Sequence, residues 1–213
     1  MQSYKYDYRK DMMRHVIEEH KILNTIHRLS LDKSVAFVSY RLPFQERVKT
    51  LLQWRSEPAR ISDLKSIHGK DGFLFAPYSI NPQTPARLIV PDVILTGDEP
   101  EESVKLINLL SAIPEKHEFL SDQVETKKSI NPQDYIKQVE RTKAIINEKK
   151  LSKMVLSRIS VDPILDNFNP SEFFNFIHQA YPEAFVYMLH IRDAGLWFGA
   201  SPEPLLHVSG NTA

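Results

Sequence analysis

The alternation of apolar and polar positions predicts a chain that mixes helices and strands. Apolar side chains at helical spacing predict a first helix from Arg9 to Leu29. Short runs rich in β-branched and aromatic residues predict strands, because these side chains suit a pleated sheet. The strands expected in the first half are Ser34–Leu42, Gly72–Tyr78 and Ala86–Pro91, with Val93–Leu95 extending the same edge. Phe44–Trp54 is interpreted as a short helix, and a surface helix and a linker are expected between Glu99 and Val124.

The second half has more regular signals. The pairs Asn131-Pro132 and Asn169-Pro170 are typical of helix starts, because asparagine caps free N–H groups and proline suits the first helical position. The elements expected after them are helices to about Lys149 and about Ala180, a strand Lys153–Val161, and a hairpin of Ala184–Ile191 and Leu196–Gly199 around Asp193-Ala194-Gly195. This order predicts an α/β (α+β) fold with a layered, largely antiparallel sheet and flanking helices.

The composition limits the possible functions. The chain has 213 residues and a formal net charge of zero, so no basic excess points to nucleic acid. It has no cysteine, which excludes disulfides, thiolate zinc sites and cysteine nucleophiles. No apolar run approaches the length of a membrane span, and the N-terminus lacks the apolar core of a signal peptide. We therefore expect a cytoplasmic protein without nucleic-acid or membrane partners.

Lys153 and Glu203 are the most informative charged residues, because both lie in otherwise apolar, strand-like segments. Most lysines and glutamates at such positions are solvated. The alternative is a lysine that burial keeps neutral, so that it acts as a base, and a glutamic acid that delivers a proton. Gly199, Ala200 and Ser201 are small residues beside a rigid Pro-Glu-Pro, and they leave room for a ligand to approach the backbone.

Other catalytic centres are poorly supported. His15, His20 and His27 are five and seven positions apart, and neither spacing puts two imidazoles on one helix face. Ser201 lies in Ala-Ser-Pro-Glu and not in the Gly-x-Ser-x-Gly turn of serine hydrolases. A histidine metal site and a serine nucleophile are therefore not expected.

Two motifs together carry a family resemblance. The segment Leu151-Ser152-Lys153-Met154-Val155-Leu156-Ser157-Arg158, with the glutamate of Gly199-Ala200-Ser201-Pro202-Glu203 fifty positions after the lysine, resembles the chorismate-utilising enzymes, most closely isochorismate synthases. The resemblance is strongest from Asp134 to Leu206. It implies that Lys153 is the general base that activates water to attack C2 of chorismate. It also implies that Glu203 is the general acid for the departing C4 hydroxyl. Ser201 is expected to contact the substrate.

The same resemblance leaves the product and the pathway open. It implies isochorismate for menaquinone or siderophore biosynthesis. Salicylate synthase and aminodeoxychorismate synthase, which can also place a lysine here, remain alternatives, as does a non-catalytic binding domain with the same fold. Members that make anthranilate with ammonia keep no lysine at this position, so Lys153 argues against that branch.

The resemblance further implies that the chain corresponds to the N-terminal portion of such an enzyme. Residues 1–124 are expected to form the N-terminal part of the fold, and residues 125–213 the start of the chorismate-binding catalytic region. The glutamate ligands of Mg²⁺ are expected beyond Ala213 in the full-length enzyme. The chain alone is expected to bind no Mg²⁺, to bind chorismate weakly and not to convert it. Exposed sheet edges are expected to promote self-association.

Overall fold

The computed structural model describes residues 21–96, 100–114 and 129–202 of the chain. It divides into two compact units. The first combines Met1–Leu120 with Asn169–Ala213, and the second is Ser121–Phe168. No helix in the described ranges is long and apolar enough to cross a membrane.

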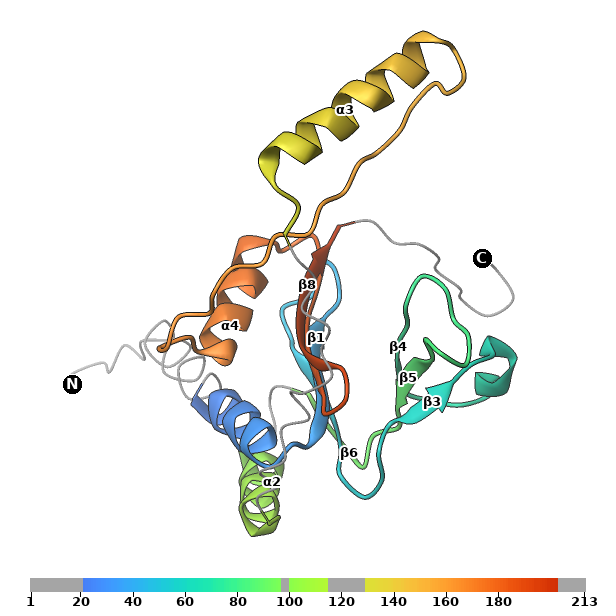
Figure 1. The fold of residues 1–213 in the computed structure, drawn as a ribbon. Helices are drawn as coiled ribbons and strands as arrows, with labels where there is room; N and C mark the ends of the chain where they lie inside the picture. Colours follow the sequence, from blue (N-terminus) through green and yellow to red (C-terminus); the bar gives the residue numbers. More distant parts are fainter. Residues whose placement is uncertain (1–20, 97–99, 115–128, 203–213) are drawn as a thin grey trace, which may run out of the picture. The chain divides into compact units, whose positions relative to one another are not determined.

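A five-stranded sheet forms the centre of the first unit (Figure 1). Its strands lie in the order β6-β2-β1-β7-β8, and every neighbouring pair is antiparallel. The strands are β1 (Ala36–Arg41), β2 (Lys49–Gln53), β6 (Val93–Thr96), β7 (Phe185–Ile191) and β8 (Gly195–Ser201). Segments from both ends of the sequence therefore share one sheet, with β1 paired to β7 across a long separation in the chain.

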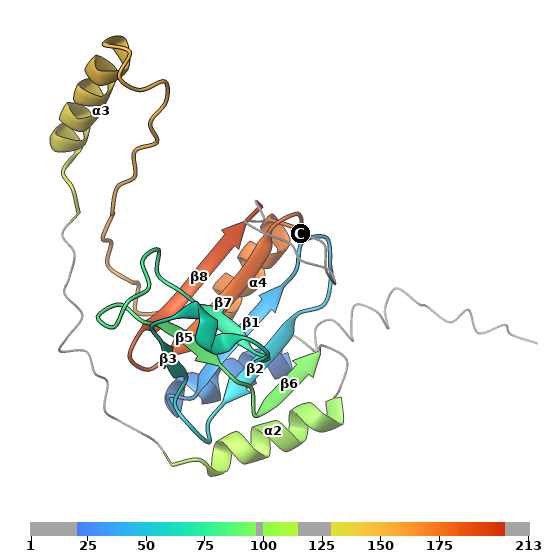
Figure 2. The same cartoon turned by 90° about the vertical axis from the view of Figure 1, so that its right-hand side faces the viewer.

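A three-stranded sheet lies against one face of the five-stranded sheet (Figure 2). Its order is β3 (Ala59–Ile61), β5 (Ala86–Ile89) and β4 (Phe73–Phe75), and a short 3-10 helix, η1 (Leu64–Ile67), follows β3. Buried side chains join the two sheets in one apolar cluster: Val38, Leu51, Leu189 and Ile191 from the larger sheet, and Ile89 from the smaller.

Helices cover the opposite face of the five-stranded sheet (Figures 1 and 2). They are a helix seen over residues 21–32, α2 (Pro100–Ala112) and α4 (Pro170–Ala180). Their buried residues, among them Ile26, Leu110 and Phe174, pack with Phe37 and Met188 of the sheet. The first unit is thus three layers deep, which confirms the mixed α/β architecture with an antiparallel sheet and flanking helices.

A buried polar network ties the helical layer to the sheet. The imidazole of His27 forms hydrogen bonds with the hydroxyls of Ser171 and Ser39, each at 2.7 Å, and Ser39 bonds in turn with Thr50. Complete burial lowers the pKa of His27 to about 3, so the ring is neutral near neutral pH. One neutral histidine thereby connects the first helix, α4, β1 and β2.

A buried arginine closes the C-terminal end of α4. Arg41 is 1% exposed, and it donates to the carbonyl oxygens of Tyr181 and Pro182 at 2.5 and 2.6 Å. It also donates to the His178 ring at 3.1 Å. The last carbonyls of a helix lack partners within the helix, so a cation at this end both satisfies them and interacts favourably with the helix dipole. This contact fixes α4 and the start of β7 beside β1.

The second unit contains α3 (Pro132–Asn147), which starts where the asparagine–proline signal predicted. The side chain of Asn131 accepts a hydrogen bond from the Asp134 amide at 2.9 Å, and Lys137 pairs with Asp134 at 3.0 Å. None of the residues of α3 is buried. The helix is therefore supported mainly by its cap, its local charge pairs and a few contacts with the segment that follows.

Several predicted elements need correction. Phe44–Trp54 is not a helix, because Lys49–Gln53 pairs as β2 between β1 and β6. Val93–Leu95 does not continue the edge of Ala86–Pro91, because β6 joins the larger sheet and β5 the smaller. Most of the predicted first helix lies outside the described residues. The strands predicted around Ala36–Arg41, Phe73–Phe75 and Ala86–Ile89, and the hairpin of β7 and β8, are confirmed.

The predicted division near residue 124 falls outside the described residues and stays a prediction. Strands on both sides of it, β1 and β7, nevertheless pair directly in one sheet. The two expected parts of the chain are therefore joined through backbone hydrogen bonds and a common core.

Candidate functional site

The segment that carries Lys153 forms no strand. Residues 151–165 have no regular secondary structure, and Lys153 is exposed. The prediction of a strand at Lys153–Val161 is therefore wrong for this structure. A strand needs a neighbour to satisfy its backbone groups, and no described strand pairs with this segment. Its hydrogen bonds include one from the Val161 amide to the Ser129 hydroxyl at 2.6 Å and one from the Thr142 hydroxyl to the Met154 sulfur at 3.5 Å.

The segment that carries Ser201, in contrast, forms a strand of the five-stranded sheet. Ser201 is the last residue of β8 and stands opposite Phe185 in the antiparallel register of β7 and β8. Its side chain reaches the surface. Glu203 lies outside the described residues, so its position and its separation from Lys153 stay predictions. Lys153 and Ser201 belong to different compact units.

A tight turn sets the register of the hairpin that ends at Ser201. Gly195 has a φ of 83°, in the left-handed region that glycine adopts without strain. The Ala194 amide donates to the Ile191 carbonyl at 2.9 Å, and the indole N–H of Trp197 donates to the Ala194 carbonyl at 2.7 Å. Because register fixes which face each side chain occupies, this turn determines the face on which Ser201 lies.

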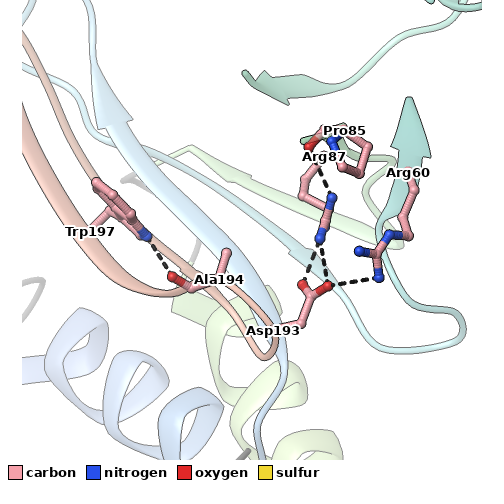
Figure 3. A network of polar contacts seen from close by, with 6 residues as sticks. All are labelled: Arg60, Pro85, Arg87, Asp193, Ala194 and Trp197. Carbon is pink, nitrogen blue, oxygen red and sulfur yellow. Dashed lines mark hydrogen bonds and ion pairs between the residues drawn. The ribbon is translucent and has the colours of Figure 1, made fainter. Parts of the chain in front are cut away.

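An ion-pair cluster joins the turn to the smaller sheet (Figure 3). The guanidinium of Arg87 donates to both oxygens of Asp193, at 2.6 and 3.2 Å, and Arg60 approaches the same carboxylate at 3.3 Å. Burial acts to raise the pKa of Asp193, but the Arg87 hydrogen bond and the two cations outweigh it and hold the pKa below its ordinary value. The turn is thus anchored to β3 and β5 by a charged, two-point contact.

Aromatic rings cover the face of the hairpin on which Ser201 lies. Tyr187 and Phe185 stand opposite Gly199 and Ser201, and their ring centres are 5.8 Å apart. Phe73 of the smaller sheet lies 6.4 Å from Phe185 and is nearly parallel to it. Burial raises the pKa of Tyr187, so its phenol stays protonated throughout the physiological range. This aromatic face offers an apolar wall with a hydroxyl donor beside Ser201.

Sequence reasoning did not find this aromatic wall. Phe185 and Tyr187 alternate with Val186 and Met188. This alternation predicts a half-buried strand with one face in the core, and it does not say what the other face contacts. The properties of that other face depend on the Phe73 ring from the smaller sheet and on Gly199 lying opposite Tyr187. Both depend on how the strands pack and pair in the folded chain. The nearest signal in the sequence was the small size of Gly199 itself.

Among the described residues, no three histidine or acidic side chains gather closely enough to hold a metal ion. The described part of the chain therefore offers no cluster of three such donors to a metal ion. The chemistry that it offers is hydrogen bonding and apolar contact at the end of β8, and the exposed amino group of Lys153.

Comparison with protein families gives one match. The model of the family described as chorismate binding enzyme matches residues 68–213, more than half of the chain. Comparison with curated proteins and with solved structures finds no match.

Proposed function

The chain belongs to the chorismate binding enzyme family, and from this premise we propose that it serves the isochorismate synthase reaction. In that reaction water adds at C2 of chorismate and the C4 hydroxyl leaves. The proposal rests above all on the span of the family match, because residues 68–213 include both the Lys153 and the Glu203 motifs. The aromatic wall beside Ser201 supports a small-molecule site at the end of β8.

Lys153 and Glu203 have complementary roles in the proposed reaction. Neutral Lys153 takes a proton from water as the water oxygen bonds to C2. The two conjugated ring double bonds shift, from C1=C2 and C5=C6 to C1=C6 and C4=C5. The C4–oxygen bond breaks, and Glu203 protonates the departing hydroxyl, which leaves as water. Hydroxide is a poor leaving group and water a weak nucleophile, so each of the two proton transfers lowers the barrier. Ser201 is proposed to hold the substrate by a hydrogen bond.

Mg²⁺ is the proposed cofactor of the full-length enzyme. When bound, such an ion neutralises carboxylate charge on the substrate and orients it. In the described part of the chain, no three histidine or acidic side chains gather closely enough to hold a metal ion.

The remaining proposals concern the setting of the reaction. We propose a cytoplasmic enzyme that supplies isochorismate for menaquinone or siderophore synthesis. Self-association is proposed through the sheet edges, because β6 and β8 are the outer strands of the five-stranded sheet and edge strands expose unpaired backbone groups. Salicylate synthase, aminodeoxychorismate synthase and a non-catalytic binding domain are the alternatives.

A product assay tests the proposed reaction. The protein expressed from its whole natural reading frame is incubated with chorismate and Mg²⁺, and the products are separated by chromatography. We expect isochorismate from the wild type and a loss of at least about a hundredfold in rate for Lys153→Ala and for Glu203→Gln, the usual scale for removing a general acid or base. Lys143→Ala, which removes an exposed lysine of α3, is the matched control and should retain the wild-type rate.

Each other result has a distinct meaning. Salicylate or aminodeoxychorismate as the product would assign the protein to a different branch. Conversion that survives both Lys153→Ala and Glu203→Gln would remove these residues from the mechanism. Chorismate that is bound and never consumed would favour the binding-domain alternative.

A further inference from the structure

The ring of Tyr187 lies across β8 at Gly199. The two residues are directly opposite in the antiparallel register. A Cβ atom placed on Gly199 would lie 2.2 Å from Cε1 of Tyr187 and 2.8 Å from its hydroxyl oxygen. The phenol therefore occupies the space that any other side chain at position 199 would fill. The hydroxyl is carried from β7 over the backbone of β8, and only glycine permits this placement.

This hydroxyl lies on the same face of the sheet as Ser201. Residues two apart in a strand share a face, and Gly199 and Ser201 are separated by about 7 Å along β8. Phe185, the partner of Ser201, and Tyr187, the partner of Gly199, are likewise two apart and on that face. The Tyr187 hydroxyl and the exposed Ser201 side chain thus border the same end of β8, with the ring of Phe185 beside them.

The Tyr187 hydroxyl has no partner of its own among the described residues, although ring contacts hold its side chain in place. The ring lies 5.8 Å from Phe185 and 6.5 Å from Phe73 between centroids. Burial alone accounts for the raised pKa of Tyr187, with no hydrogen bond contributing. A phenol hydroxyl that is held in place without a protein acceptor can donate its proton to a ligand oxygen. The fixed ring makes the donor ready for such a ligand.

We propose that the Tyr187 hydroxyl, held over Gly199, donates a hydrogen bond to a carboxylate oxygen of chorismate bound at the Ser201 end of β8. This inference rests on the proposed function, since it takes chorismate as the ligand. It adds a substrate-binding residue on β7 that neither motif contains. It also gives Gly199 a role, because a side chain there would displace the ring that carries the donor.

Equilibrium dialysis with chorismate tests this proposal on the protein expressed from its whole natural reading frame, with Glu203→Gln in every sample so that bound chorismate is not consumed. Tyr187→Phe removes only the hydroxyl and keeps the ring over Gly199, so the fold is retained. A hydrogen bond to a charged acceptor is worth enough that we expect the dissociation constant to rise about tenfold or more. Tyr40→Phe is the matched control. Tyr40 is also a partly buried phenol, directly opposite Tyr187 and packed on Phe73. It lies one strand further from β8, so chorismate affinity should stay within about twofold of the Glu203→Gln protein with both tyrosines intact.

The outcomes separate this inference from the proposed function. Full-length protein with Tyr187 intact that shows no saturable binding of chorismate overturns both. If this protein binds, and the Tyr187→Phe variant binds equally well, the role of Tyr187 is overturned and the proposed function stands. Equal losses in Tyr187→Phe and Tyr40→Phe also overturn it, because the effect would then belong to the aromatic wall in general. Circular dichroism and urea midpoints that match the protein with Tyr187 intact show that the Tyr187→Phe result concerns binding.

Discussion

The β7–β8 hairpin and residues 151–165 have similar kinds of residues but different structures. Both are apolar and rich in residues that favour strands. In the hairpin, Met188 and Leu189 are completely buried, and β7 is paired on both sides. In residues 151–165, Val155 is 80% exposed and Leu165 is 74% exposed, and no strand forms.

The difference shows that strand propensity is realised only where a partner exists. β7 lies between β1 and β8, and its two faces are covered by the helical layer and by the smaller sheet. The segment with Lys153 follows α3, a helix without buried residues. Measured strand preferences largely reflect packing against neighbours, so the same residue types give different results in the two settings.

The largest expected effect comes from matched leucine truncations in the two regions. Leu189→Ala removes a completely buried side chain and should lower the free energy of unfolding by about 2–5 kcal/mol. Leu165→Ala removes a side chain that is 74% exposed and should change it by less than about 0.5 kcal/mol. Urea denaturation followed by circular dichroism measures both. Similar losses for the two variants would show that residues 151–165 are packed in solution. That result would contradict the structural difference between the two regions.

A second test measures how the stability of the first unit depends on pH. The pKa of His27 is about 3 in the folded protein and 6.5 ordinarily, so below pH 6.5 the unfolded chain binds the proton more readily. Stability is therefore full above about pH 6.5 and falls as the pH is lowered towards 3. Between pH 7 and pH 5 this histidine should cost the first unit about 2 kcal/mol.

His27→Gln is the variant that isolates this effect. Glutamine does not titrate, so unfolding of the variant should lose about that much of its dependence on pH between 7 and 5. His190→Gln is the comparison, because burial also lowers the pKa of His190 while its hydrogen bond with the Val35 carbonyl acts to raise it. An unchanged pH dependence in His27→Gln would contradict the buried, neutral state of the ring.

The smallest expected effect concerns the turn of the hairpin. Asp193→Asn weakens the contacts to Arg87 and Arg60, and we expect a loss of about 1 kcal/mol at low salt because the carboxylate is partly exposed. The pKa of Asp193 is lowered in the fold, so its contribution is present above about pH 4 and is lost as the pH falls through the lowered pKa. Urea titrations at low and high salt should show the difference shrinking with salt. A loss that does not depend on salt would assign the effect to the turn backbone.

Local signals in the sequence predicted the elements whose causes are local. The asparagine caps of α3 and α4 and the glycine of the β7–β8 turn depend on neighbouring residues, and these elements are confirmed. The interpretation of Phe44–Trp54 as a helix was wrong because β2 is defined by pairing with β1 and β6, which a local pattern does not contain. The strand at Lys153 was predicted from its composition. Composition does not show whether a neighbouring strand is present to pair with it.

The candidate site likewise has features that the sequence predicted and features that only the fold shows. The family resemblance and the residues that carry it were visible in two short motifs, and the family is confirmed. The buried links of His27 and Arg41, and the ring of Tyr187 over Gly199, join residues that are far apart in the chain. Such contacts arise from register and packing, so they became visible only with the fold.

Hydrogen–deuterium exchange with and without saturating chorismate tests the central claim most directly. The claim is that both motifs serve one ligand, although the two regions differ so much in structure. We expect slower exchange on binding in peptides that contain Lys153 and in peptides that span Ser201 and Glu203, with no change in α2. Protection confined to one motif, or protection in neither, would contradict it.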